Sequence, residues 1–251
     1  MSDKQRPYDQ EMEVTEHLNE LRKRLLWSFM VFVLFFIIGF IYVEDIFRFF
    51  ENDSQFEFIV LGPGEILWIY MIIASTVAVA LTLPFLSLQI WLFVKPGLTP
   101  KEQKVTVTYI PVIFLLFVGG LLFGYLVIKD LILNFLLSLN AGMFEEMFTA
   151  EKYFRFIMQV TLPFAFFFEI PVISMFLTSL GIISPMFLKK VRKYAYLVLV
   201  ILGTMLSPPD FILQLVVAIP LIVLYEVAIM TSQFVYRRKL AAEQEMSMDS
   251  Q

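Results

Sequence analysis

The most constraining feature of the sequence is a run at residues 161–181 that is almost purely apolar yet contains one carboxylate, Glu169. About 20 consecutive apolar residues are enough to cross a bilayer as a helix, so the run predicts a membrane span. An acidic side chain at the centre of such a span costs roughly 2.5 to 3.5 kcal/mol on insertion scales. Glu169 therefore indicates a cavity, a partner or a proton path, or else a structural hydrogen bond to a neighbouring helix.

Apolar segments occur six times along the chain. They cover residues 25–43, 67–94, 105–128, 153–180, 194–206 and 211–235. The first four are long enough to span hydrocarbon, whereas the fifth would reach only about 20 Å as a helix and the sixth is interrupted by Gln214 and Glu226. We predict an all-α integral membrane protein with six transmembrane helices, of which the last two are short and form a hairpin. The alternative is five spans and one re-entrant hairpin.

The charges predict the orientation of the chain. With six spans, fifteen Lys and Arg residues lie on the side of the two chain ends and four on the other. Positive residues accumulate on the cytoplasmic side, so we expect a multi-pass protein of the cell membrane with both termini in the cytoplasm. The expected parts are a cytoplasmic segment at 1–24, a transmembrane domain at 25–235 and a cytoplasmic tail at 236–251.

Composition excludes several functional classes. The chain is 59% hydrophobic, contains one His and no Cys, and has a net charge of −4. Disulfides, thiolate metal sites and multi-histidine metal sites are thereby excluded, and nothing indicates nucleic-acid binding. The sequence has no Gly-rich phosphate loop, so we expect no cofactor and no direct use of ATP.

Proline and glycine positions predict helix shape and packing. Five prolines fall inside predicted spans, where each removes a backbone donor and favours a kink: Pro84, Pro111, Pro163, Pro171 and Pro220. Bent helices around a concavity are therefore expected, although membrane helices often tolerate proline. Gly120 and Gly124 are four residues apart in the third span, a spacing that permits close helix contact.

Two carboxylates flank the membrane on the predicted cytoplasmic side. Glu20 lies in HLNELRKRLL at residues 17–26, and Glu102 lies in KPGLTPKEQK at residues 95–104. Arginine binds a carboxylate through two parallel hydrogen bonds, so two such groups would suit a ligand with two adjacent arginines. The simpler interpretation is a solvated helix start in which Glu20 pairs with Arg24, four residues later.

Two further acidic residues lie near the last two spans. Asp210 follows two prolines and is expected to cap the helix that begins at Phe211. Glu226 is expected to reach the lipid headgroups or Arg237.

Five motifs follow one another in a fixed order. They are HLNELRKRL (17–25), KPGLTPKE (95–102), FEIP (168–171), SPPD (207–210) and QLVVAIPLIVLYE (214–226). In order and spacing this set resembles the TatC family, the polytopic core of the twin-arginine protein translocase, over about residues 13–236. The resemblance implies a curved, glove-like helical wall.

The resemblance also implies a function. TatC proteins bind twin-arginine signal peptides of folded cargo at the cytoplasmic face and assemble with single-span TatA-type or TatB-type subunits in the lipid membrane. Transport is driven by the proton-motive force, so the protein is not expected to be an enzyme, and several copies are expected to associate in the complex.

Particular residues match the functional positions of that family. The implied signal-peptide patch consists of Glu20, Leu21, Arg22, Pro96, Lys101 and Glu102. Glu169 and Gln214 match intramembrane polar positions, and the implied contacts to partner subunits are Met205, Leu206 and Gln214.

Three alternatives remain from the residues alone. A proton-coupled secondary transporter of a small solute would use Glu169 and Glu226 as proton sites. An intramembrane enzyme would need a nucleophile or a metal set, which the scattered carboxylates and the one histidine do not supply convincingly. A scaffold for other membrane proteins is partly compatible with the translocase interpretation.

Overall fold

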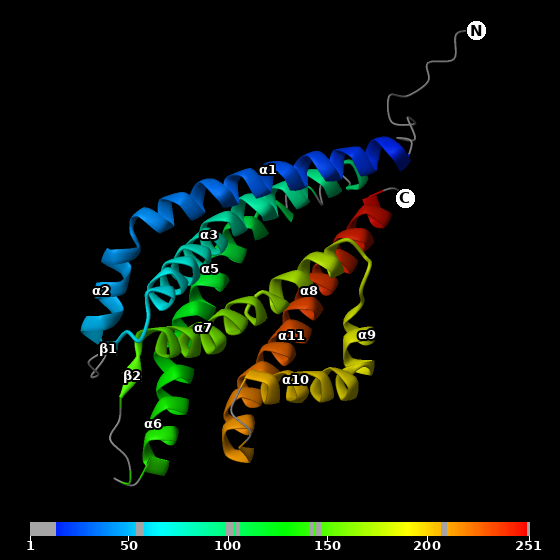
Figure 1. Ribbon diagram of the computed structural model, residues 1–251. Coiled ribbons are helices and arrows are strands. Elements are labelled where there is room, and N and C mark those ends of the chain that lie inside the picture. The colour runs from blue at the N-terminus through cyan, green and yellow to red at the C-terminus, as the bar shows by residue number, and fades with distance from the viewer. Residues whose placement is uncertain are drawn as a thin grey trace.

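The computed structural model describes residues 14–53, 58–98, 103, 106–140, 143, 147–206 and 210–249, and side chains within 17–241 of these ranges. This part of the chain is almost entirely helical (Figure 1). The α-helices are α1 (Val14–Ile41), α2 (Val43–Asp53), α3 (Pro63–Val94), α5 (Tyr109–Phe123), α6 (Lys129–Asn140), α7 (Ala150–Phe167), α8 (Ile170–Ser179), α9 (Pro185–Lys190), α10 (Arg192–Leu206) and α11 (Phe211–Asp249).

Shorter elements complete the fold. The 3₁₀ turn η1 (Lys95–Gly97) follows α3, and the π-helical turn η2 (Gly124–Ile128) joins α5 to α6. Strands β1 (Phe58–Ile59) and β2 (Phe148–Thr149) pair in parallel, with Phe58 opposite Phe148. The pair ties together the two long connections that precede α3 and α7.

Five helical stretches in the described residues are long and apolar enough to cross a membrane. They are His17–Ile41, Pro63–Gly97, Tyr109–Asn140, Ala150–Ser179 and Phe211–Ala241. The predicted all-α membrane fold is therefore confirmed. Helix α10, predicted to be short, has 15 residues and a length of about 22 Å, which is less than the hydrocarbon thickness of about 30 Å.

The helices form an open wall rather than a closed bundle. Helix α1 packs mainly on α3, which in turn contacts α5 and α7, while α8 packs on α11 and α11 on α10. Helices α1 and α10 thus lie at opposite edges of the wall (Figure 1). One apolar core joins α2, α3 and α7, and a second joins α7 to α10 and α11.

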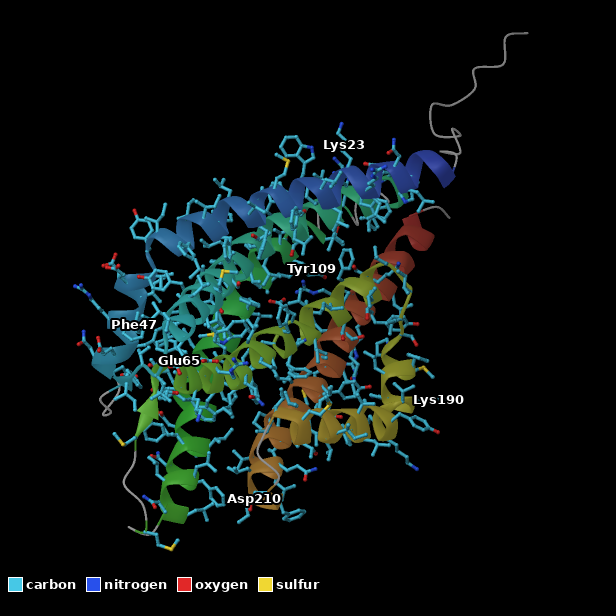
Figure 2. All side chains as sticks on the ribbon, in the orientation of Figure 1. Lys23, Phe47, Glu65, Tyr109, Lys190 and Asp210 are labelled. Atoms are coloured by element: carbon cyan, nitrogen blue, oxygen red, sulfur yellow. The ribbon has the colours of Figure 1, made fainter. Side chains whose placement is uncertain are left out.

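Different helices and strands form the two ends of the molecule. The beginning of α1 and the end of α11 lie at the same end, here called the terminal end (Figure 1). Helices α2 and α6 and the β1–β2 pair lie at the other end, here called the cap end. Phe47 on α2 and Glu65 on α3 accordingly lie far from Lys190 on α9 (Figure 2).

The prediction of a short last helix is wrong. Helix α11 has 39 residues and runs through residues 235 and 236, where the tail was expected to separate from the membrane domain. Residues 237–246, RRKLAAEQEM, contain strong helix formers and no glycine or proline, so nothing stops the helix. The expected boundary at residues 24 and 25 likewise falls inside a continuous helix, α1.

The fourth predicted span is two helices rather than one. Helix α7 ends at Phe167 and α8 begins at Ile170, with Phe168 and Glu169 in a turn between them. Pro171 lies in the first turn of α8, where a missing backbone donor costs nothing. Pro111 occupies the same kind of position in α5, so only Pro84, Pro163 and Pro220 are interior to helices.

The glycine pair of the third span packs directly against α7. A Cβ atom on Gly120 would lie 2.6 Å from the Cα atom of Ala165, and one on Gly124 would lie 2.7 Å from the Cα atom of Thr161. These separations are too short for any side chain, so the close helix contact that the spacing predicted is present.

A charged cluster fastens α2 to the wall at the cap end. The Tyr125 hydroxyl donates to the Asp53 carboxylate at 2.5 Å, and the buried Lys129 ammonium lies 3.5 Å from Asp53 and 3.1 Å from Asp130. The Tyr125 hydrogen bond, supported by Lys129, lowers the pKa of Asp53 despite the opposing effect of burial. The cluster therefore favours the ionised form of Asp53.

Candidate functional site

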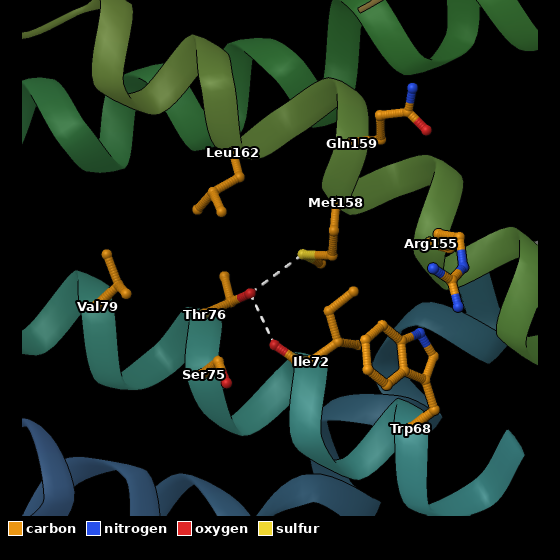
Figure 3. A pocket seen from close by; sticks show the side chains of 9 residues that line it. All are labelled: Trp68, Ile72, Ser75, Thr76, Val79, Arg155, Met158, Gln159 and Leu162. Atoms are coloured by element: carbon orange, nitrogen blue, oxygen red, sulfur yellow. Dashed lines mark hydrogen bonds between the residues drawn. The ribbon is translucent and has the colours of Figure 1, made fainter. Parts of the chain in front are cut away.

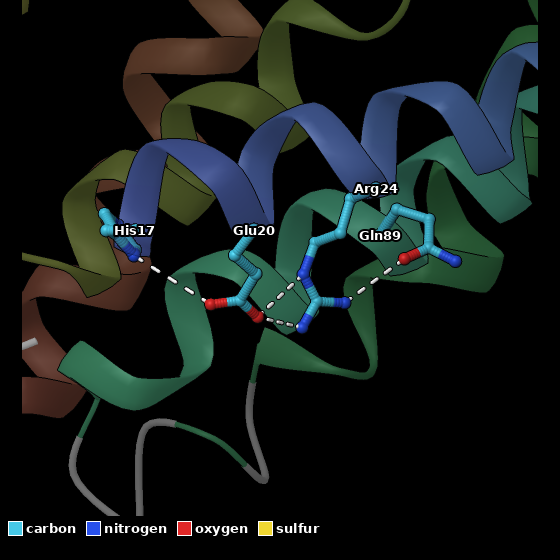
Figure 4. Close-up of polar contacts among 4 residues, drawn as sticks. All are labelled: His17, Glu20, Arg24 and Gln89. Atoms are coloured by element: carbon cyan, nitrogen blue, oxygen red, sulfur yellow. Dashed lines mark hydrogen bonds and ion pairs between the residues drawn. The ribbon is translucent and has the colours of Figure 1, made fainter. Parts of the chain in front are cut away.

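Glu20 is held in place by neighbours on its own helix (Figure 4). The Arg24 guanidinium donates two hydrogen bonds to one oxygen of Glu20, Oε1, and the bond from Nε measures 3.0 Å. The other oxygen, Oε2, lies 4.0 Å from His17 Nδ1. The predicted pairing of Glu20 with Arg24 is confirmed, and Glu20 already binds a guanidinium group.

The same turn of α1 is fixed against the end of α3. The His17 ring stacks on Phe93 with 4.1 Å between ring centroids, and Arg24 Nη1 donates to Gln89 Oε1 at 3.2 Å. Both contacts join α1 to the last turns of α3. Glu20 therefore lies beside the point at which the 95–104 loop leaves α3.

That loop folds back onto α3. The Gln103 amide donates to the carbonyls of Lys95 and Leu98 at 3.2 and 3.1 Å, and Trp91 donates to Thr106 at 2.8 Å. Lys101 and Glu102 lie outside the described residues. Since Gln103 is the next residue after Glu102, the described contacts place the neighbour of Glu102 beside the end of α3.

The other residues predicted for this patch are on the surface. Leu21, Arg22 and Pro96 are all exposed at the terminal end. Glu20 is thus a partly exposed carboxylate bordered by exposed polar and apolar side chains.

Glu169 lies in the turn between α7 and α8 and is only 5% exposed. Within the described part of the chain, neither carboxylate oxygen has a hydrogen-bond partner. The hydrogen bond to a neighbouring helix that the sequence left open is therefore not formed by these residues. An unsatisfied acid in such a place is costly, which makes Glu169 a candidate for contact with water or a partner.

Gln214 does not lie near Glu169. A hydrogen bond of 2.6 Å between Thr178 and Ser232 sets the register of α8 and α11, which run in the same direction (Figure 1). Glu169 is nine residues before Thr178 and Gln214 is eighteen before Ser232, so the two differ by about 14 Å along the helices. These intramembrane positions are separate features.

The three residues predicted to contact partner subunits lie around the α10–α11 connection. Met205 is 70% exposed, whereas Leu206 is partly buried against the core. Gln214 is half-buried, and its amide has no hydrogen bond among the described residues. An exposed apolar side chain at the end of α10 and a half-buried amide in the first turns of α11 thus lie on either side of this connection.

Asp210 and Glu226 both make contacts within the α10–α11 pair. Asp210 Oδ1 accepts hydrogen bonds from the backbone of Ile212 and Leu213, at 2.8 and 3.1 Å, so the predicted cap is confirmed. Glu226 does not pair with Arg237, one of its two expected contacts. It binds Arg192 of α10 at 2.5 Å and the Tyr196 hydroxyl, because α10 folds back beside α11.

Sequence reasoning missed the Arg192–Glu226 pair because the two residues are 34 apart and only the fold brings them together. Across the described residues, no group of three or more His, Cys, Asp or Glu is placed to hold a metal ion.

The fold and these positions define a multi-pass helical membrane protein with a surface carboxylate patch. Comparison with known protein families identifies the family to which it belongs. Residues 16–220 match the family described as Sec-independent protein translocase protein (TatC), and the chain belongs to that family. The protein is thus a component of a protein translocase.

Individual relatives agree with this assignment. The chain is 45% identical to the TatCd protein of Bacillus subtilis strain 168, covering 93% of this chain and 96% of the relative, and 39% identical to TatCy of the same organism, covering 91% of each. A crystal structure described as the twin arginine translocase receptor TatC in DDM superimposes with a TM-score of 0.77 at 30% identity. The match covers 86% of this chain and 99% of that one.

Proposed function

We propose that this protein is the receptor for twin-arginine signal peptides within the translocase and binds them at the terminal end. The observation that carries the proposal is the position of Glu20, which already binds a guanidinium and lies beside the end of α3. Glu102 follows in the loop that leaves that end, so the two carboxylates suit paired arginines.

The proposed binding step is an exchange of guanidinium groups. Arg24 uses only Oε1 of Glu20, and the 4.0 Å contact of Oε2 with His17 is a weak one. An arginine of the signal peptide would take Oε2 or replace Arg24, while the second arginine binds Glu102. Leu21 and Pro96 would contact the apolar residues next to the arginine pair, and Arg22 and Lys101 would border the patch.

The proposed orientation places the terminal end in the cytoplasm and counts α10 as the sixth crossing. Two features support this assignment. The beginning of α1 and the end of α11 lie at the same end (Figure 1), which an even number of crossings requires. Positive residues also accumulate on that side. We propose the proton-motive force as the energy source, with transport of folded proteins rather than catalysis as the activity.

The test is binding of a twin-arginine peptide to the purified full-length protein in vesicles. The double variant Glu20→Gln/Glu102→Gln should weaken photocrosslinking of that peptide by about tenfold or more, since each charged hydrogen bond is worth roughly 1.5 to 3 kcal/mol. A twin-lysine peptide should bind weakly to both proteins. Glu65→Gln, which removes a carboxylate at the cap end, is the matched control. Undiminished crosslinking in the double variant would disprove the receptor role.

We also propose that single-span TatA-type or TatB-type subunits bind at the α10–α11 edge through Met205, Leu206 and Gln214. The exposed Met205 side chain and the free amide of Gln214 support this surface. Gln214→Leu should reduce copurification of the single-span subunits. Gln159→Leu, an exposed glutamine on α7, should not. Equal copurification with both variants would contradict the proposed edge.

Glu169 serves assembly or transport in this proposal rather than peptide capture. Its carboxylate lacks a partner among the described residues, and a partner helix or water would relieve that cost. Glu169→Ala should therefore reduce export of a folded reporter while peptide crosslinking at the terminal end stays intact. Full export by this variant would remove Glu169 from the mechanism.

A further inference from the structure

A groove lies between α3 and α7, and its lining begins at Trp68 and Arg155, near the starts of these two helices (Figure 3). Its volume is about 310 Å³. Trp68 and Arg155 line one end of it, whereas Val79 and Leu162 line the other. The groove belongs neither to the Glu20 patch nor to the α10–α11 edge.

The mouth of the groove is cationic and aromatic. The Arg155 guanidinium stacks on the Trp68 ring, 4.7 Å from its centroid, and uses one nitrogen to bind Glu151 at 2.5 Å. Lys152, one turn earlier on α7, is exposed. Tryptophan and arginine at the start of membrane helices are typical of the headgroup level of a bilayer.

Basic residues are few at the cap end. The connections there contain four, Arg48, Lys129, Lys152 and Arg155. Lys129 is buried in the Asp53 cluster, and Arg48 lies on α2. Of the remaining two, Arg155 lies at the mouth of the groove and Lys152 one turn before it on α7, and the one carboxylate that pairs with Arg155 leaves most of its donors available.

Below the mouth the groove becomes apolar. Gln159 lies one turn, about 6 Å, deeper than Arg155 at the α7 rim, and its amide has no hydrogen bond within the described part of the chain. The Ser75 hydroxyl donates to the Met71 carbonyl and the Thr76 hydroxyl to the Ile72 carbonyl, and Thr76 Oγ1 also lies 3.2 Å from Met158 Sδ on α7 (Figure 3). Those hydroxyls are satisfied, so the inner wall behaves as an apolar surface.

The length of the groove favours an acyl chain over a helix as its ligand. Trp68 and Val79 are eleven residues apart on α3, or about 16 Å, which matches one leaflet of a hydrocarbon core about 30 Å thick. A transmembrane helix would instead need a contact surface through both leaflets, whereas the lining of this groove ends at Val79 and Leu162.

We propose that this groove binds one anionic glycerophospholipid from the leaflet at the cap end. Arg155 and Lys152 bind the phosphate, and Gln159 donates to an ester carbonyl of the glycerol, which lies just below the phosphate. One acyl chain fills the space between Ile72, Val79 and Met158 (Figure 3). The lipid would stabilise the contact between α3 and α7.

The test is lipid retention measured by native mass spectrometry. The full-length protein is reconstituted in vesicles of equal phosphatidylglycerol and phosphatidylethanolamine and then extracted in mild detergent. We expect one phosphatidylglycerol to be retained in preference to phosphatidylethanolamine. Arg155→Gln and Lys152→Gln should each lower that preference about fivefold, the factor expected for one cation near a membrane surface. Arg48→Gln, which removes a cation elsewhere at the cap end, is the control and should retain it.

A second variant tests the acyl slot without changing charge. Val79→Phe should reduce retention of both lipids, and circular dichroism verifies that the helices are intact. The proposal would be overturned if the wild type, Lys152→Gln and Val79→Phe all retained phosphatidylglycerol equally. It would also be overturned by a copurifying single-span subunit that is lost with Val79→Phe while lipid retention is unchanged, because the groove would then hold a helix.

Discussion

Replacement of Gly120 by alanine tests the closest helix contact in the wall. The new Cβ atom would lie 2.6 Å from Ala165 Cα and 2.8 Å from the Phe164 carbonyl oxygen. Both are backbone atoms, so neither moves without shifting α7 relative to α5. Overpacking of this kind costs about 1 to 3 kcal/mol. The exchange also gains up to about 1 kcal/mol of helix propensity, which reduces the net loss.

Gly119 provides a matched control on the same helix. A Cβ atom there has nothing within 4 Å, so Gly119→Ala gains the helix propensity without the clash. The two variants have the same composition and differ only in which face of α5 carries the methyl group. Because the propensity gain is the same in both, we expect Gly120→Ala to be less stable than Gly119→Ala by roughly 1 to 3 kcal/mol.

The measurement is thermal unfolding of both purified variants in one detergent, followed by intrinsic tryptophan fluorescence. At about 2 to 4 °C per kcal/mol for a chain of this size, Gly120→Ala should melt about 2 to 12 °C below Gly119→Ala. Gly124→Ala should resemble Gly120→Ala, because its Cβ would lie 2.7 Å from Thr161 Cα. Equal midpoints for Gly119→Ala and Gly120→Ala would show that α5 and α7 do not pack as described.

Two other contacts make separate predictions. The hydrogen bond from Tyr125 and the charge of Lys129 lower the pKa of Asp53, so its contribution to stability is present above its unfolded pKa of about 4 and disappears as pH falls through the folded value. The difference in melting temperature between wild type and Asp53→Asn should therefore shrink below about pH 4; a constant difference would contradict this. Arg192→Gln and Glu226→Gln should destabilise the protein non-additively, because each removes the same ion pair, and additive shifts in the melting temperature would count against that pair.

The positions of the spans follow from the sequence because burial in lipid requires long apolar helices. Both the first apolar segment and the short fifth one lie within helices, as their apolar composition and length predicted. The end of α11 could not be read in the same way. Hydropathy marks where a segment leaves the hydrocarbon, whereas a helix continues as long as its residues favour one, and residues 237–246 do.

The contacts of the candidate site likewise fall into two groups, those between nearby residues and those between residues far apart in the chain. The Glu20–Arg24 pair and the Asp210 cap depend on residues two to four apart, so local rules predict them. The contact of Arg192 with Glu226 and the strand pair at Phe58 join residues far apart in the chain. Such contacts depend on how the helices fold back on one another, and a single sequence does not reveal this arrangement.

The open wall also explains why this protein functions within an assembly. Gln159, Glu169 and Gln214 lie in helical stretches long enough to cross the membrane, on three separate parts of the wall, and none has a side-chain hydrogen bond within the described part of the chain. A closed bundle would pair such groups internally, because an unsatisfied polar group is costly in hydrocarbon. Here each is left for something outside the chain, in our proposals a lipid ester for Gln159, water or a partner helix for Glu169 and a single-span subunit for Gln214. We therefore expect binding at these three positions to relieve a cost that the isolated chain retains.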